Sequence, residues 1–153
     1  MWDSSMTIML LEGTRDTLYM TLLATFFGYV FGLPMGIALM VTAKDGIQPS
    51  SRGGQRVYAV IYKILDVIVN ITRSIPFLIL LILVIPLTKL IVGKSYGSAA
   101  TIVPLTIAAA PFIARMVESS LKEVDRGVIE AAQSMGASTG RIIWSVLLVE
   151  ART

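Results

Sequence analysis

The feature of this sequence that most limits its possible folds is its long runs without any charged residue. Residues 17–43 contain none, and residues 95–114 contain none. A helix needs roughly 20 apolar residues to cross the hydrocarbon core of a bilayer. Because backbone polar groups in lipid must be satisfied within the segment itself, such runs favour membrane-spanning α-helices. We predict an all-α polytopic transmembrane helical bundle that forms a single domain over residues 1–153.

Two further segments complete the predicted set of spans. Residues 64–88 start with charges but become purely apolar after Arg73, which predicts a second span between those at 17–43 and 95–114. The apolar run that starts at residue 142 resembles the opening of another span. We therefore expect a multi-pass protein whose last span is cut short where the sequence stops.

The basic residues predict the orientation of the chain. Cytoplasmic loops keep an excess of Lys and Arg, and most basic residues of this chain lie in the polar loop at 44–56 and in the segment 115–141. Both segments are therefore predicted to be cytoplasmic, with the N-terminus on the other side of the membrane.

Composition leaves little room for enzymatic chemistry. The chain has no Cys and no His, which removes the commonest nucleophile, general base and transition-metal ligands. We expect no catalytic residues, no metal site and no enzymatic activity. A net charge of +3 gives no electrostatic footprint for nucleic acid. Gly93-Lys94-Ser95 resembles the end of a P-loop, but Thr88 stands where that pattern needs Gly, so ATP binding by this chain is not expected.

Three glycines in the first run predict a helix-packing face. Gly28, Gly32 and Gly36 recur at every fourth residue, so they share one side of a helix and would let another backbone approach closely. The alternative is the ordinary glycine enrichment of membrane helices. We refer to these three residues as the glycine face.

A stripe of polar residues marks the helix expected at the start of the second span. Lys63, Asp66, Asn70 and Arg73 follow spacings that put them on one helix face. Such residues normally face a bundle interior or a watery cavity, which predicts a helix that lines a translocation path. Alternatively, this helix projects into the cytoplasm, or Lys63 and Arg73 extend to the membrane surface.

The segment 125–141 differs in character from the spans. Val128, Ala131, Ala132 and Met135 fall at the spacings of a short amphipathic helix. Gly136 suits the left-handed conformation that ends a helix, so a second short helix is expected to follow. This segment is either a partner-docking element, in which Glu130 offers an anchoring charge, or an interfacial helix that binds nothing.

The same segment carries a family resemblance. Glu130-Ala131-Ala132, followed by Gly136 and an apolar run from Ile142, resembles the EAA loop of binding-protein-dependent ABC importer permeases. The stretches RSIPFLILL from residue 73, VIPLTKLIVG from 84 and IVPLTIAAAPFIARMVESSL from 102 are most similar to the bacterial methionine-importer permeases. The resemblance extends over most of the chain from residue 17 onward.

The resemblance implies a subunit of the bacterial inner membrane that moves an amino acid, most similar in type to a methionine importer. It implies a second copy of the permease, an ABC ATPase subunit, an extracytoplasmic substrate-binding protein and surrounding membrane lipid as partners. It implies no cofactor bound by this chain, since ATP is used by the ATPase. In that family the EAA helix docks on the ATPase, which implies partner-binding roles for Glu130, Ala131, Ala132, Met135, Gly136 and Ala137.

Two departures from the family pattern stand out. Related permeases commonly carry Pro where this chain has Val149, and they continue for further spans, so the chain is expected to be truncated at its C-terminus. Two other functions remain open: a stand-alone channel or ion-coupled carrier that needs no ATPase, and a membrane assembly protein that transports nothing.

Overall fold

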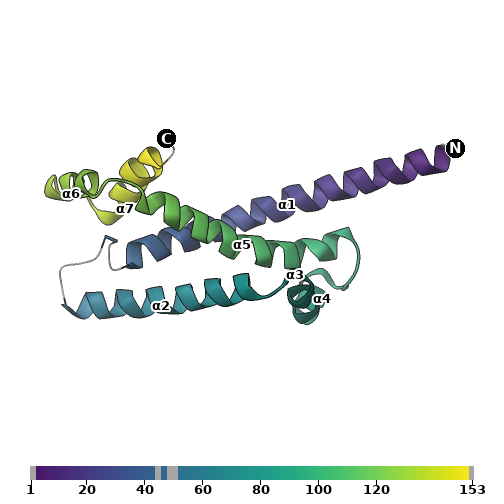
Figure 1. Cartoon of the computed structure of the whole chain (residues 1–153), viewed down its shortest axis with the longest axis horizontal. Coiled ribbons are helices and arrows are strands. Elements are labelled where there is room, and N and C mark those ends of the chain that lie inside the picture. Colours follow the sequence, from purple (N-terminus) through teal and green to yellow (C-terminus); the bar gives the residue numbers. More distant parts are fainter. Residues whose placement is uncertain (1–2, 44–45, 48–51, 152–153) are drawn as a thin grey trace.

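The computed structural model describes residues 3–43, 46–47 and 52–151, and every regular element among these residues is a helix (Figure 1). This confirms the predicted all-α class. The predicted loop at 44–56 lies partly outside the described residues, and its residues 52–56 are helical instead. The elements are α1 (Ser4–Thr42), α2 (Arg52–Ser74), α3 (Phe77–Leu83), α4 (Ile85–Val92), α5 (Ser98–Lys122), α6 (Arg126–Ser134), α7 (Thr139–Ile142), the π-helical turn η1 (Ile143–Leu147) and α8 (Leu148–Glu150).

Helix α1 begins well before the predicted start of the first span at residue 17. The side chain of Asp3 caps it by accepting a hydrogen bond from the Ser4 N–H at 3.2 Å. Its 39 residues correspond to roughly 58 Å of helix, against roughly 30 Å of hydrocarbon. The charged residues before residue 17 are exposed, so they mark where the apolar run starts and not where the helix starts.

The glycine face lies against α5, and Pro34 does not interrupt the helix that carries it. Gly28, Gly32 and Gly36 are all buried. A β-carbon on Gly36 would lie 2.7 Å from the carbonyl oxygen of Ala114, and one on Gly28 would lie 3.1 Å from the β-carbon of Ala109. The backbones of α1 and α5 therefore approach each other closely along three successive turns.

The predicted second span at 64–88 is not one continuous helix. Helix α2 ends at Ser74, and α3 starts after Pro76 at an angle of 109° to it. The cause is local, because Pro disfavours helical geometry at the preceding residue and supplies no N–H to the ladder. A second break occurs at Val84, between α3 and α4. Pro86 follows it in the first turn of α4. By length and composition, α1 and α5 are each long enough to cross a membrane, and α2 with α3 forms a bent third candidate.

Helix α5 runs on beyond the predicted end of its span at residue 114. It continues to Lys122 and includes Pro104 and Pro111 without a break. The chain then folds back, and α6, α7, η1 and α8 gather at the end of the bundle where α1 ends and α2 begins (Figure 1). The predicted start of a span at 142 coincides with the junction of α7 and η1.

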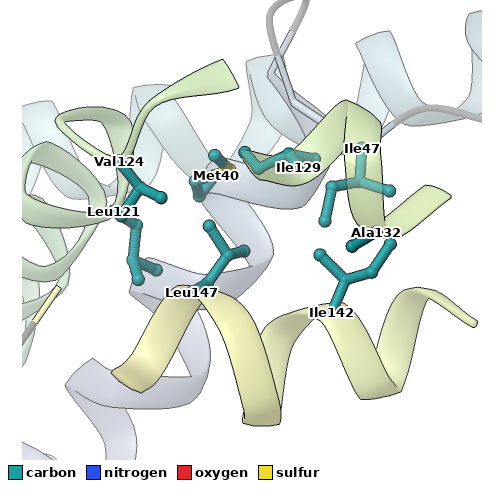
Figure 2. Close-up of a cluster of buried hydrophobic side chains, with 8 residues drawn as sticks. All are labelled: Met40, Ile47, Leu121, Val124, Ile129, Ala132, Ile142 and Leu147. Atoms are coloured by element: carbon teal, nitrogen blue, oxygen red, sulfur yellow. The ribbon is translucent and has the colours of Figure 1, made fainter. Parts of the chain in front are cut away.

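A cluster of buried apolar side chains holds this end of the molecule together (Figure 2). It joins the last turns of α1 and α5 to the short helices that follow α5, so those helices have a defined position on the bundle. The members of the cluster are Met40, Ile47, Leu121, Val124, Ile129, Ala132, Ile142 and Leu147.

Candidate docking segment and polar network

The segment 125–141 forms two short helices, α6 and α7, with a left-handed residue between them. Asp125 caps α6 by accepting a hydrogen bond from the Gly127 N–H at 2.7 Å. Gly136 has a φ of 77°. Its N–H donates to the carbonyl of Gln133 at 2.9 Å, and the N–H of Ala137 donates to that of Ala132 at 3.1 Å. This pair of bonds is the Schellman motif, which ends a helix and fixes the direction of the chain after it.

Helix α6 has an inner face and an outer face. Ile129 and Ala132 are buried in the apolar cluster, whereas Val128 is 40% exposed and Met135 is 82% exposed. The predicted apolar face is therefore divided, because Ala132 points inward while Val128, Ala131 and Met135 remain exposed. The outer face is an apolar surface that nothing in the described part of the chain covers.

The other predicted docking residues lie on α6 or directly after it. Glu130 is exposed on α6. Gly136 is also exposed, and among the described residues no atom lies within 4 Å of where its β-carbon would be. Ala137 is half-buried and packs against the apolar cluster. Helix α6 is thus anchored on one side and presents an acidic group and apolar side chains on the other.

The predicted polar stripe of α2 does not act as one unit. Lys63 and Arg73 are exposed on the outside of α2. Asp66 and Asn70 instead meet Arg115 of α5. Asn70 also donates to Asp66 from its amide nitrogen at 3.1 Å. Two stripe residues therefore join α2 to α5, and the other two do not.

Arg115 connects the two helices within a larger polar network. Its Nη2 donates to Asp66 Oδ1 at 2.6 Å and to Asn70 Oδ1 at 2.9 Å. Its Nη1 donates to Glu118 Oε2 at 2.6 Å, and Lys122 donates to the other oxygen of Glu118 at 2.6 Å. We refer to Asp66, Asn70, Arg115, Glu118 and Lys122 as the polar network.

Glu118 is the buried centre of this network. Its side chain is 1% exposed, yet it receives two cations and a longer hydrogen bond from the hydroxyl of Tyr62 at 3.4 Å. The ammonium of Lys122 also lies 5.8 Å from the centre of the Tyr62 ring. Leaving a buried charge without its partner typically destabilises by about 3–5 kcal/mol, so the buried carboxylate of Glu118 depends on Arg115 and Lys122.

Arg115, Glu118 and Lys122 were not among the residues singled out from the sequence. Their spacing of three and four residues puts them on one face of a helix, and this signal was present in the sequence. The apolar run stops at residue 114, however, so the charges beyond it were assigned to a cytoplasmic segment. The helix that continues to Lys122 makes that spacing meaningful.

An apolar cavity of about 630 Å³ lies between α1, α2, α4 and α5. Phe27, Ile68, Leu87 and Ile107 contribute to its walls, one from each helix. The buried hydroxyl of Thr106, which also lines it, has no hydrogen-bond partner among the described residues. The polar stripe of α2 contributes no wall residue to this cavity.

Comparison with known proteins gives consistent matches. Residues 53–152 match the family model described as binding-protein-dependent transport system inner membrane component. The D-methionine transport system permease protein MetI of Salmonella typhimurium is 48% identical over 149 residues. The protein of the same name from Escherichia coli K12 is 50% identical over 143 residues. These alignments cover 97% and 94% of this chain, and 65% and 62% of the length of those relatives.

A solved structure has the same fold. It is described as an inward-facing conformation of the MetNI methionine ABC transporter, and it matches with a TM-score of 0.89 at 48% identity. The match covers 98% of this chain and 66% of that chain. The present chain thus spans about two thirds of the length of the proteins that it resembles.

Proposed function

From the fact that this chain belongs to the family of binding-protein-dependent transport system inner membrane components, we infer that it is the permease subunit of an ATP-driven importer for methionine. The observation that carries this inference is the 48% identity to a D-methionine permease, maintained over 97% of the chain. The chain supplies membrane-spanning helices in a multi-pass arrangement in the inner membrane of a bacterium. It performs no covalent chemistry and holds no cofactor, because ATP is bound and hydrolysed by a separate ATPase subunit.

The outer face of α6 is proposed to be the ATPase-docking surface. It combines exposed apolar side chains at Val128, Ala131 and Met135 with the exposed carboxylate of Glu130. A helix with an apolar face and a charged edge suits insertion into a groove of a partner. Gly136 and Ala137 fix the turn that orients this helix, so they contribute through geometry as well as contact.

The remaining partners follow from the same family membership. A second copy of the permease would complete the transport pathway, and an extracytoplasmic binding protein would deliver the amino acid. Lys63 and Arg73 are the stripe residues available to such a pathway, since Asp66 and Asn70 bind Arg115. The transport step is a switch between two packed arrangements, driven by the difference in partner contacts in each state.

Uptake of radiolabelled methionine tests this function. A bacterial strain without methionine importers would express the gene for this chain together with its ATPase and its binding protein. Methionine should accumulate only when all three are present. A matched strain would carry an ATPase variant that binds ATP without hydrolysing it, and accumulation should then stop.

Two outcomes would replace the proposal with another function. Accumulation that persists without the ATPase would indicate a channel or an ion-coupled carrier. Stable binding to the ATPase with no accumulation of either methionine stereoisomer would indicate a membrane assembly protein.

A further inference from the structure

We propose that Arg115 is a positioning residue for transport, which fastens α2 to α5 so that movement of the docking helix α6 also moves α2. This inference rests on the proposed function, because it assigns the mechanical route from the docking surface into the membrane helices. It concerns residues on α2 and α5 that the docking segment itself does not include.

Helix α5 contacts α1 and α2 in two different ways. Along α1, α5 is held by close backbone contact at the glycine face. Its junction with α2 is of another kind. Ala114 of α5 and Val69 of α2 pack with Leu39 of α1 in a small apolar cluster, and the bonds from Arg115 to Asp66 and Asn70 lie beside it. Arg115 follows Ala114 directly, and Asp66 and Asn70 lie on either side of Val69.

The guanidinium of Arg115 donates hydrogen bonds in two directions. Nη2 points to α2, where it binds two acceptors, and Nη1 points along α5 to Glu118. A planar guanidinium holds such partners in a fixed relation, which an ammonium on a flexible stem does not. Sliding of α2 along α5 would break both bonds to Nη2 and leave Asp66 without its cation.

The end of α5 connects the junction of α2 and α5 to the docking helix α6. Beyond Arg115, Glu118 and Lys122 lie on the same face of α5, and α5 ends at Lys122. Leu121 and Val124 pack in the apolar cluster with Ile129 and Ala132 of α6 (Figure 2). A displacement of α6 therefore acts on the end of α5, and Arg115 transfers it to α2.

The network is balanced in charge, which favours a link that stays closed. Two carboxylates, Asp66 and Glu118, face two cations, Arg115 and Lys122. The amide of Asn70 both accepts from Arg115 and donates to Asp66. Because Arg115 holds two acceptors on α2 at once, a closed link favours movement of α2 and α5 as one body.

The test removes or moves the carboxylate that faces Arg115, with substitutions that keep the shape of each side chain nearly unchanged. Asp66→Asn removes the charge that faces Arg115 and leaves the Arg115–Glu118 pair intact. The double variant Asp66→Asn with Asn70→Asp returns a carboxylate one turn away, at a position that Arg115 already contacts at 2.9 Å. Glu12→Gln, on the exposed N-terminal part of α1, is the control for loss of a carboxylate elsewhere.

In the complete transporter, Asp66→Asn should assemble and hydrolyse ATP, while methionine transported per ATP falls about fivefold or more, the lower end of usual coupling strengths. The double variant should recover most of this ratio, and Glu12→Gln should keep it. An unchanged ratio in Asp66→Asn would overturn the proposal. A parallel loss of membrane abundance, ATP hydrolysis and uptake, which indicates a purely structural role, would also overturn it.

A second measurement does not depend on transport. The chain has no Cys, so spin labels can be placed on cysteines introduced at the exposed positions Val67 of α2 and Met116 of α5. Asp66→Asn should broaden the distance distribution between the labels, and the double variant should narrow it again; identical distributions would contradict the link. Absence of methionine uptake by the unmodified transporter would overturn the proposed function alone, whatever the label distances show.

Discussion

The backbone of Gly32 in α1 lies directly against the backbone of Ala110 in α5, so that a β-carbon on Gly32 would be 2.7 Å from the Ala110 carbonyl oxygen. The same β-carbon would lie 2.8 Å from that of Ile113. Neither neighbour is the flexible end of a side chain. Any residue other than glycine at position 32 must therefore move the two helices apart.

We expect Gly32→Ala to destabilise the bundle by about 1–3 kcal/mol, the usual cost of overfilling a packed contact. Thermal unfolding in detergent would measure this. Gly13→Ala is the matched control, because Gly13 lies in the same helix and no atom in the part of the chain that the structure describes lies within 4 Å of the added carbon. Alanine there should be neutral or stabilising by up to about 1 kcal/mol. Equal effects of the two substitutions would mean that the glycine face faces lipid.

The orientation of the chain can be tested with single cysteines. Ser134 and Ser138 are exposed in the docking segment, and Ser5 is exposed near the start of α1. Cysteines at 134 and 138 should react with an impermeant thiol reagent only after the membrane is permeabilised. A cysteine at 5 should react in intact cells. Labelling of 134 or 138 from outside would contradict both the orientation and the docking surface.

Much of the fold could be predicted from local patterns. Uncharged runs predict α1 and α5. The glycines at every fourth residue predict the side of α1 that packs against another helix. The direction of the chain after Pro76 could not be predicted, because a run of apolar residues has the same hydropathy whether it continues straight or turns by 109°. Hydropathy reports solubility in lipid and contains no information about angle.

The site could be predicted in part, for a similar reason. The spacing around Ala131 and Met135 predicted a short amphipathic helix, but periodicity alone did not reveal that Ala132 faces inward and Ala131 outward. That division depends on the cluster around Ala132, to which Met40 of α1 and Leu147 of η1 also contribute. The partner of Asp66 was equally hidden, because Arg115 belongs to a helix far along the sequence.

Substitutions at two adjacent alanines in α6 allow the docking role to be tested separately from folding. Ala132 is 5% exposed in the apolar cluster, so Ala132→Asp would bury an unpaired carboxylate and should detach α6 from the bundle. Ala131→Asp adds the same group to the outer face and should leave thermal stability unchanged while it weakens ATPase binding about tenfold, which corresponds to 1.4 kcal/mol. Limited proteolysis and a binding titration with the ATPase would distinguish the two. Normal ATPase binding by Ala131→Asp would indicate that α6 is an interfacial helix without a docking role.

The turn at Gly136 provides a test of how α6 is oriented. Its φ of 77° lies in the region where a side chain costs roughly 1–2 kcal/mol, with asparagine the best tolerated replacement. No atom of the described residues lies within 4 Å of the position of an added β-carbon, so backbone strain is the main direct effect expected of a small substitution. Gly136→Ala should therefore change the path from α6 to α7 and lower methionine uptake per ATP, whereas Gly136→Asn should keep most of it. Gly140→Ala, in a helical turn that is equally open, should instead raise helix stability. If Gly136→Ala transports as well per ATP as Gly136→Asn, the left-handed turn does not determine how α6 meets the ATPase.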